Sequence, residues 1–428
     1  MTKRLYYDQP DLLEFDAVVE DATGVSGDGS GAGSLPAVIL RETAFYPTSG
    51  GQVHDTGWLA VGGSERVRVA EVADLEDGRV VHYLEAPAKP PAAGAAVHGS
   101  IDPERRRDHM QQHTGQHVLS AAFLSLYEFP TVSFHMGEDY CSIDLGTESL
   151  SAKQIVGAEK RANEIVFENR PVRIRYVGRA EAEKLGLRKL PPEGREELRL
   201  IEVADFDLSA CGGTHVGSTG QIGSILLRKT EKTRQGLRVE FVCGGRTVRV
   251  ARRDYSTLTE AAALYSAQMG DVPEMIRKGF EELKALRRQR EDALEQLAGA
   301  MAEAALKIGS SCDRASGSSA ATPDVTAGVR VISRAFSDRD INFAKLFAQK
   351  VTRAGLPVVA LVGSAVNPPG LVFAQSAGGA GDMGALLKQV LSSVGGRGGG
   401  SRDFAQGGVP AGCDVEQLLR QAAGTIGD

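Results

Sequence analysis

The sequence predicts an α+β protein of several domains, and three observations support this class. The chain has 428 residues, more than one ordinary hydrophobic core accommodates. Apolar and polar residues alternate at strand spacing near the N-terminus, whereas the middle of the chain carries long helical periodicity. Strand-like and helical runs alternate near the C-terminus. We therefore expect a β-rich, barrel-like domain at 1–98, an α+β domain at 99–253, a helical segment at 254–310 and a small α/β domain at 311–428.

Four short runs in the first domain have the alternation that predicts strands, at residues 16–20, 37–42, 66–72 and 78–84. The Gly/Ser-rich segment 23–34 predicts a long loop. The segment FYPTSGGQ at 45–52 is different, because two adjacent glycines permit backbone conformations and close approaches that a Cβ would forbid. We expect this segment to form the wall of a pocket.

Helical periodicity begins at Asp102, with acidic residues in the first turn. A second helix is expected at 151–169, with Ser149 near its start, and paired strands are expected within 222–251. Residues 274–308 then have apolar side chains at heptad spacing, and a helix of about 33 residues would be about 50 Å long. Such a helix buries its stripe either in an intrachain helical hairpin or in a coiled-coil homodimer.

The C-terminal domain begins after a linker-like segment at 309–328. Strands are expected at 329–333, 357–363 and 371–376, and helices at 338–354, at 382–393 and from Asp414 onward. Asp382 is the expected cap of the second of these helices.

Composition favours a soluble protein in a reduced, cytoplasmic setting. The apolar fraction is 42%, five scattered cysteines form no disulfide framework, and neither a secretory signal nor a membrane-spanning run is apparent. The net charge of -6 gives no hint of a nucleic-acid partner, but residues 226–253 hold nine Arg or Lys against two Glu. This basic stretch, together with Arg105–Arg107, is either a solvated surface or part of an RNA-binding face.

Two histidine motifs predict a metal site. His113 and His117 are four residues apart on the helix expected after Asp102, so both imidazoles lie on one face. Cys211 and His215 are separated by Gly-Gly-Thr, which lets a loop fold tightly around an ion. Three imidazoles and one thiolate suit Zn²⁺. Four protein ligands are also compatible with a purely structural zinc, and the residue types do not decide between the two roles.

These motifs, with FYPTSGGQVHDTG at 45–57 and SFHMG at 133–137, resemble the editing domain of alanyl-tRNA synthetases and its free-standing AlaX-type relatives. The Gly-rich run GGRGGGSRDFAQGG at 395–408 resembles the C-terminal DHH-associated domain of the same synthetases. The match covers nearly the whole chain in the family order, and the arrangement is similar to the long AlaX form.

The resemblance implies a hydrolase that removes a noncognate amino acid, chiefly serine and secondarily glycine, from mischarged alanine tRNA. It implies one zinc ion per chain on His113, His117, Cys211 and His215. Thr48 is the expected reader of the seryl hydroxyl, since size alone cannot reject alanine while admitting serine, and Gly50 and Gly51 are expected to contact the substrate. Gln52 and His135 are the candidate catalytic groups, with His135 the only titratable one. For Thr48 and His135, a turn residue and a satisfied structural histidine are the alternative interpretations.

The Gly-rich run has no GK[ST] and is not a P-loop. The resemblance implies that the Gly-rich run binds tRNA, with Arg397 and Arg402 near phosphates. Composition alone also fits a flexible linker. Three rival functions are a zinc-containing RNA-binding protein without catalysis, a metal-dependent hydrolase of another ester or of a peptide, and a D-aminoacyl-tRNA hydrolase. The HExxH pattern of metalloproteases is absent, because Thr-Gly-Gln stands between His113 and His117.

Overall fold

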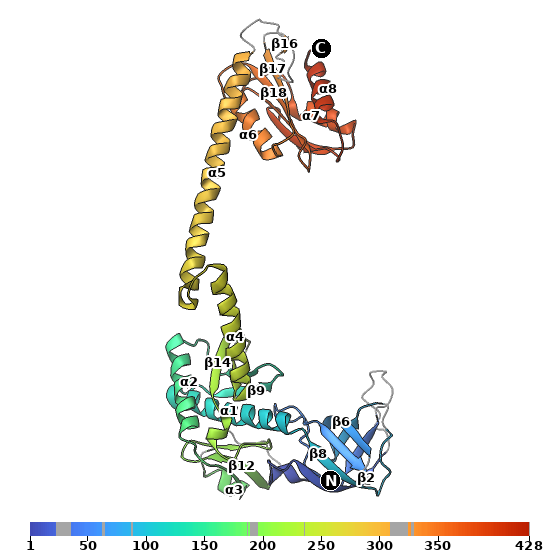
Figure 1. The fold of residues 1–428 in the computed structure, drawn as a ribbon, viewed down its shortest axis with the longest axis vertical. Helices are drawn as coiled ribbons and strands as arrows, with labels where there is room; N and C mark the ends of the chain where they lie inside the picture. Colours follow the sequence, from blue (N-terminus) through green and yellow to red (C-terminus); the bar gives the residue numbers. More distant parts are fainter. Residues whose placement is uncertain are drawn as a thin grey trace. The chain divides into compact units, whose positions relative to one another are not determined.

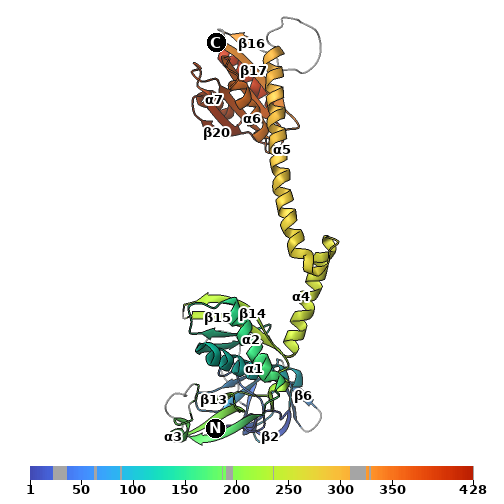
Figure 2. The same ribbon diagram turned by 90° about the vertical axis from the view of Figure 1, so that its left-hand side faces the viewer.

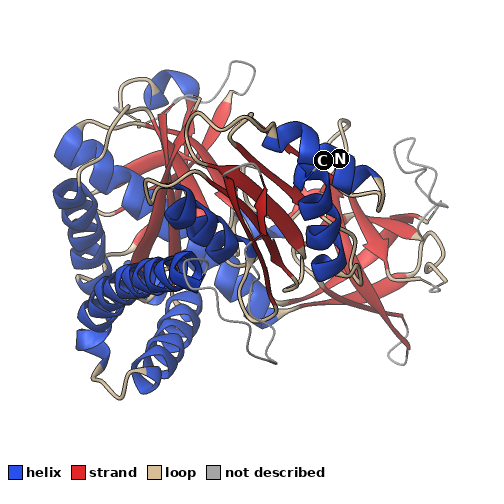
Figure 3. Cartoon of the chain, turned by 90° about the horizontal axis from the view of Figure 1, so that it is seen from above, coloured by secondary structure: helices blue, strands red, loops and turns tan. Residues whose placement is uncertain are grey.

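The computed structural model describes residues 1–22, 36–61, 65–86, 89–185, 187–188, 196–234, 236–308, 324–326 and 329–427. Helices and strands both make up large parts of these residues, which confirms the predicted mixed class (Figure 3). The chain divides into two compact units, Met1–Ala261 and Ala262–Asp428. The Gly/Ser-rich segment 23–34 and most of the expected linker at 309–328 lie outside the described residues.

Six strands near the N-terminus close into a barrel in the order β2-β3-β7-β6-β5-β8 (Figure 1). They are β2 (Glu14–Asp21), β3 (Ala37–Leu40), β5 (Gly57–Val61), β6 (Glu65–Asp74), β7 (Val80–Leu84) and β8 (Ala96–Ile101). The alternation predicts four of them and misses β5 and β8. The boundary expected at residue 98 falls inside β8, and β8 closes the barrel by pairing with both β2 and β5.

Short elements precede and flank the barrel. The strand β1 (Lys3–Arg4) pairs in parallel with β4 (Glu42–Thr43), and the 3₁₀ turn η1 (Leu5–Tyr7) follows β1 directly. This turn places two consecutive tyrosines against Tyr46, whose ring lies 5.2 Å from that of Tyr6.

The helix α1 (Pro103–Tyr127) begins where the sequence predicts it. The Asp102 carboxylate accepts the backbone N–H groups of Glu104 and Arg105, and a proline occupies the first turn. The next helix, α2 (Ala152–Phe167), is capped by Ser151 instead of the expected Ser149. Gln154, three residues after Ser151, completes a capping box, and no such partner is available to Ser149.

Both helices pack on a four-stranded antiparallel sheet in the order β14-β15-β10-β9 (Figure 2). Its strands are β9 (Thr131–Met136), β10 (Cys141–Leu145), β14 (Ile225–Thr233) and β15 (Gly236–Cys243). Leu119 and Phe123 of α1 and Ile165 of α2 meet Ile143 and Phe241 of the sheet in one buried core. The expected strands within 222–251 end earlier than predicted, because the helix α4 (Gly245–Leu264) begins directly after β15.

A three-stranded sheet completes the first unit. Its elements are β11 (Val172–Gly178), β12 (Glu197–Val203) and β13 (Asp207–Ala210), with the short helix α3 (Arg179–Ala182) after β11 and the 3₁₀ turn η2 (Thr219–Ile222) after β13. The loop between β13 and η2 carries Cys211 and His215.

The second unit is a six-stranded sheet with helices. Its elements are η3 (Met269–Asp271), α5 (Val272–Ile308), β16 (Asp324–Thr326), β17 (Val329–Phe336), α6 (Ile341–Thr352), β18 (Val358–Ser364), β19 (Gly370–Gln375), α7 (Met383–Ser392), β20 (Arg397–Gly400), β21 (Phe404–Gly408) and α8 (Val415–Gly427). Strand order is β16-β17-β18-β19-β21-β20. Asp382 caps α7 as predicted, by accepting the backbone N–H of Ala385.

The long predicted helix is α5, whose 37 residues include the heptad region. Its last turns pack on α6 through Ala298, Ala302 and Ala305, which are buried. By contrast, Phe280 and Leu286 are 68% and 53% exposed. Within the described residues, α5 thus buries its C-terminal part and leaves an apolar stripe uncovered nearer its start.

Candidate metal centre

Four side chains from two separate segments converge in the first unit. His113 and His117 lie one turn apart on α1, and Cys211 and His215 come from the loop after β13. The Cys211 Sγ lies 3.4 Å from His113 Nε2 and 3.3 Å from His215 Nε2. The four candidate ligand atoms all lie within 4.8 Å of one another. The structure therefore brings together all four residues of the predicted site.

Each of the three imidazoles is oriented by a hydrogen bond at its Nδ1. His113 Nδ1 lies 2.7 Å from Gln52 Oε1, His117 Nδ1 lies 3.3 Å from an Asp207 carboxylate oxygen, and His215 Nδ1 lies 3.1 Å from Thr114 Oγ1. Outer partners of this kind fix the ring orientation of metal-binding histidines and leave Nε2 for the ion. The same arrangement holds all three rings, although the partners come from three different segments.

The amide of Gln52 is itself fixed in orientation. Its Nε2 donates to Thr214 Oγ1 at 2.8 Å, and its Oε1 accepts the backbone N–H of Thr214 at 3.1 Å. Because Oε1 is an acceptor, the proton of His113 lies on Nδ1 and the Nε2 lone pair faces Cys211. The donor set of three imidazole nitrogens and one sulfur is the type that zinc prefers.

Electrostatics favours the deprotonated forms of two acidic groups at the cluster, Asp207 and Cys211. Burial opposes ionisation of Asp207, but its hydrogen bond with His117 and the Arg188 guanidinium lower its pKa to about 2. Burial likewise opposes the thiolate of Cys211, but the neighbouring imidazoles of His113 and His215 hold its pKa well below its ordinary value. A deprotonated thiol is the form that binds a metal ion.

Glycine is required where the Cys211 loop passes α1. A Cβ on Gly213 would stand 2.1 Å from His113 Cε1, so a side chain there would collide with a ligand. Similarly, Gly51 has φ +86°, and a Cβ would stand 2.5 Å from the carbonyl oxygen of Phe134. Phe134 in turn stacks on His113, with ring centroids 5.5 Å apart. Both glycines thus allow the close packing that fixes His113.

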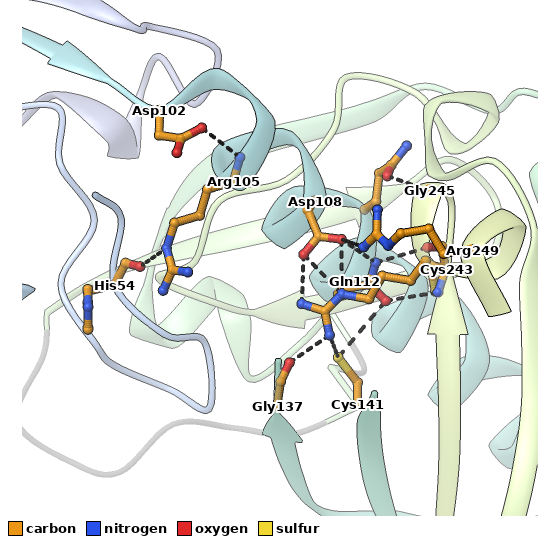
Figure 4. A network of polar contacts seen from close by, with 12 residues as sticks. His54, Asp102, Arg105, Asp108, Gln112, Gly137, Cys141, Cys243, Gly245 and Arg249 are labelled. Carbon is orange, nitrogen blue, oxygen red and sulfur yellow. Dashed lines mark hydrogen bonds and ion pairs between the residues drawn. The ribbon is translucent and has the colours of Figure 1, made fainter. Parts of the chain in front are cut away.

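A polar network anchors α1 one turn before the first ligand (Figure 4). The Asp108 carboxylate accepts from the Arg246 guanidinium at 2.6 to 3.0 Å. The Gln112 amide forms two hydrogen bonds with the backbone of Cys243, at 3.0 and 2.8 Å. Figure 4 shows Gln112 joined to Cys243 and Cys141, at the ends of two sheet strands, with Asp108 near it on the same helix. The register of α1 against β15, and with it the position of His113, is therefore fixed.

A cavity of about 360 Å³ opens beside the cluster. Its lining includes His113, Cys211 and Gly213 on the metal side. The lining also includes Arg4, Tyr6, Tyr7, Tyr46, Ser49 and Gly50. The FYPTSGGQ segment thus contributes to the wall of a pocket, as its glycines suggest.

The predicted substrate and catalytic residues fall in different places. Gly50 lines the cavity, whereas Gln52 is fully buried and holds His113. Thr48 is exposed, and its Oγ1 accepts the backbone N–H of His54 at 3.1 Å and lies 3.0 Å from His54 Nδ1. The Thr48 hydroxyl is therefore engaged within its own turn and is not part of the cavity lining.

His135 does not join the site. It lies on β9 next to Phe134, and adjacent strand residues point to opposite faces of a sheet. Since Phe134 stacks on His113, the His135 ring points away from the cluster. Its side chain is 58% exposed and lies 3.8 Å from the Asp144 carboxylate. The geometry places this histidine at the surface, beside Ser133 and Asp144.

The two arginines of the Gly-rich run lie in the second unit. Residues 397–408 form the hairpin of β20 and β21, so this run is part of the sheet and not a linker. Arg397 is exposed, whereas the Arg402 guanidinium donates to the carbonyls of Gly381 and Ala380 at 3.2 and 3.1 Å. A cavity of about 1400 Å³ in this unit has no histidine or cysteine in its lining.

Sequence reasoning missed the outer partners and the tyrosines. Asp207 is separated from His117 by 90 residues, and no local spacing relates the two. Tyr6 and Tyr7 stand at the very start of the chain, where the sequence offers no pattern to connect them with the histidines. The consecutive aromatic residues in RLYYD were the one available signal.

The chain is similar to tRNA synthetases and to an alanyl-tRNA editing protein. Residues 198–239 match a family described as the threonyl and alanyl tRNA synthetase second additional domain, and residues 3–105 match the class II (A) tRNA synthetases. The alanyl-tRNA editing protein AlaX-L of Pyrococcus horikoshii is 29% identical over 420 residues, which cover 96% of this chain and 95% of that protein. The chain is thus similar to an alanyl-tRNA editing protein over nearly its whole length.

Alanine–tRNA ligases are also similar to this chain. The ligase of Pyrococcus furiosus is 36% identical over 69% of the chain, and that of Halobacterium salinarum is 34% identical over all of it. The chain spans 32% and 44% of the length of these two ligases. No helix among the described residues is long and apolar enough to cross a membrane.

Proposed function

We propose that this protein is a trans-editing hydrolase that deacylates alanine tRNA mischarged with serine or glycine. The observation that carries the proposal is the cluster of His113, His117, Cys211 and His215, with each imidazole oriented from outside, beside a cavity open to a ligand. The relative that matches nearly the whole chain is named as an alanyl-tRNA editing protein. A cytoplasmic location belongs to the same proposal.

The four ligand residues would hold one zinc ion per chain. Such an ion would supply Lewis-acid chemistry, by polarising an ester carbonyl, activating water or anchoring an amino group. Gln52 and Thr214 would keep His113 in the tautomer that offers Nε2. The second unit would bind tRNA, with Arg397 near phosphates.

The protein side chains of the cavity would bind and orient the aminoacyl group. Burial raises the pKa of Tyr46 and of Tyr6 well above that of an ordinary phenol, so both hydroxyls stay protonated near neutral pH. They can therefore take part in hydrogen bonds but cannot act as bases. Gly50 adds a stretch of wall without a side chain, where the backbone is accessible to a substrate.

The decisive experiment is hydrolysis of seryl-, glycyl- and alanyl-tRNA(Ala) by the purified protein, with and without a zinc chelator. We expect release of serine and glycine, sparing of alanine and loss of activity with chelator. Cys211→Ala should abolish both zinc content and activity, whereas the matched variant Cys413→Ala, in the second unit, should change neither. Full activity in zinc-free protein would refute the metal role, and zinc without any hydrolysis would favour an RNA-binding protein.

A homodimer through residues 274–308 is part of the proposal. The exposed apolar side chains of Ile276, Phe280 and Leu283 lie on α5 four and three residues apart, which is the spacing of a helix–helix seam. Light scattering should give twice the monomer mass, and Phe280→Glu should shift it to the monomer. Leu356→Glu, at an exposed apolar side chain outside α5, is the control that should leave the mass unchanged. A wild-type protein of monomer mass would contradict the dimer.

A further inference from the structure

A set of polar side chains around Arg4 lines the cavity beside the metal cluster and takes no part in holding the four candidate ligands. Arg4 Nη1 donates to the phenolic oxygens of Tyr6 and Tyr7, at 3.2 and 3.4 Å. The same guanidinium is fixed by the Asp74 carboxylate, at 2.7 and 3.1 Å. Arg4, Tyr6, Tyr7 and Asp74 all line the cavity. One arginine thus places two hydroxyl groups at the wall of the candidate site.

Tyr7 is also linked, through Arg199, to the loop that carries Cys211. Arg199 Nε donates to the carbonyl oxygen of Tyr7 at 2.9 Å, and Arg199 Nη1 donates to the carbonyl oxygen of Cys211 at 2.6 Å. The Arg199 guanidinium lies 5.4 Å from the centre of the Tyr7 ring, within cation–π range. The Tyr7 hydroxyl is the nearest group to the position that a Gly212 side chain would take, at 3.6 Å. These contacts fix the position of Tyr7 relative to Cys211.

Hydrogen bonding and exposure together distinguish Tyr7 from the other two tyrosines. Tyr46 donates its hydroxyl proton to the carbonyl of Ser49 at 3.0 Å. Tyr6 is fully buried, whereas Tyr7 is partly exposed. The Tyr7 oxygen accepts from Arg4, and its own proton has no acceptor among the described residues. Tyr7 is thus a donor held in place and left available to a ligand in the cavity.

We propose that the Tyr7 hydroxyl reads the side-chain hydroxyl of a seryl ester bound beside Cys211, an assignment that rests on the proposed editing function. Alanine is smaller than serine, so a pocket that admits serine cannot exclude alanine by size. A donor that pairs with the seryl oxygen makes the discrimination instead, because the methyl group of an alanyl ester leaves the donor unpaired, whereas a glycyl ester leaves room for a water molecule to pair with it. Arg4 serves as the positioning residue, since it orients the Tyr7 phenol through its oxygen.

This assignment differs from the one that the sequence predicts. Thr48 is the expected reader of the hydroxyl, but His54 already engages its Oγ1. Tyr7 and Thr48 therefore make opposite predictions for two conservative variants, Tyr7→Phe and Thr48→Val. Each removes one hydroxyl and retains the rest of the side-chain shape.

The test compares seryl- and glycyl-tRNA(Ala) as substrates of the full chain. Glycine has no side chain, so loss of a contact with the seryl hydroxyl affects only the seryl ester. We expect Tyr7→Phe to lower kcat/KM for seryl-tRNA about tenfold and to leave that for glycyl-tRNA and the zinc content unchanged. Inhibition by stable 3′-seryl- and 3′-glycylamido analogues of the terminal adenosine gives the same comparison without turnover. Tyr176→Phe is the matched control, because its hydroxyl donates to Asp8 outside the cavity lining and both substrates should be spared.

Each other outcome overturns the assignment. Equal losses for both esters in Tyr7→Phe would make Tyr7 a structural or adenosine-binding residue. A selective seryl loss in Thr48→Val, with Tyr7→Phe unchanged, would return the role to Thr48. A wild-type protein that hydrolyses neither ester would overturn the proposed function and the assignment with it, and zinc analysis of that protein would show whether the metal site itself had formed.

Discussion

Arg106 on α1 and Asp55 in the loop before β5 form an ion pair that is closed off from water, with side-chain exposures of 1% and 0%. The guanidinium also donates to the carbonyls of Pro10 and Ala44, at 2.7 and 2.5 Å, and Asp55 accepts the backbone N–H of Tyr46 at 2.7 Å. The pair and its hydrogen bonds therefore join α1 to the barrel at both ends of segment 45–52, which contributes to the cavity wall.

Removing one partner of this pair should be costly. Arg106→Met leaves the Asp55 carboxylate buried and uncompensated, and we expect a loss of about 3–5 kcal/mol in the free energy of unfolding. Urea denaturation followed by fluorescence of Trp58, the single tryptophan and a residue of β5, measures this directly. Arg79→Met, at an exposed pair with Asp77, should cost less than about 1 kcal/mol. The double variant Asp55→Asn/Arg106→Met should be more stable than Arg106→Met, and an equal or lower stability would contradict the argument.

Asp207 should control metal affinity without binding the metal. Asp207→Asn weakens the acceptor at His117 Nδ1, and we expect the zinc affinity to fall by about 10- to 100-fold. Competition with a chromogenic chelator provides the measurement. The control is Asp205→Asn, two residues away at an exposed position with φ +55° that asparagine also adopts. Equal affinities of the two variants would show that the carboxylate does not act through the imidazole.

His82 should make the barrel sensitive to acid. Burial lowers the pKa of His82 to about 4, and in the unfolded chain a histidine has a pKa near 6.5. Between these values the unfolded state binds a proton that the folded state does not, so stability is lost as the pH falls from about 6.5 to 4. From pH 7 to pH 5 this histidine alone should account for about 2 kcal/mol.

The variant His82→Gln tests this, because glutamine can still donate to Val38 and accept from Thr43. Its barrel should lose less stability than the wild type over the same pH range, as reported by Trp58. His98 is the contrasting control, since hydrogen bonds with Asp16 and Glu14 raise its pKa, and any stabilising contribution would be lost as the pH rises. If wild type and His82→Gln have the same pH dependence, His82 is not the titrating group.

The second unit should contribute to binding and not to chemistry. All eight histidines precede the boundary at Ala261, and the described part of the second unit offers no candidate metal ligands grouped together. A chain ending at Ala261 should keep its zinc and its kcat for seryl-tRNA, while KM rises and the salt dependence of kcat/KM becomes flatter. Steady-state kinetics at several ionic strengths provides the measurement. An unchanged KM with a collapsed kcat would instead place part of the second unit in the active site.

The metal ligands could be predicted from sequence because their signal is local. His113 and His117 share a helix face by their spacing alone, and Cys211 and His215 flank two glycines. Asp382 and Asp102 can likewise be recognised as helix caps from the sequence, because capping depends on the next three residues. By contrast, β8 is recognisable only through its partners β2 and β5, and the first of these is far away in the sequence.

The residues around the ligands could not be predicted, because they are brought in by the tertiary fold. Gln52 reaches His113 from the barrel loop, and Tyr7 reaches Cys211 through Arg199. The position of His135 depends on a different feature. The two-residue period of a strand places it on the face opposite Phe134, the side chain that does contact His113, and its catalytic role stays a prediction.

The separation of the two ligand pairs along the chain has a consequence for biosynthesis. A growing chain that has passed His117 displays only two imidazoles, which bind zinc weakly, and the other two ligands follow nearly a hundred residues later. The outer acceptor of His117 is also made late, because Asp207 lies in β13. If the cluster holds zinc as proposed, tight capture of the ion would have to wait until almost the whole first unit has been synthesised, and zinc uptake would be a late step in the formation of this unit.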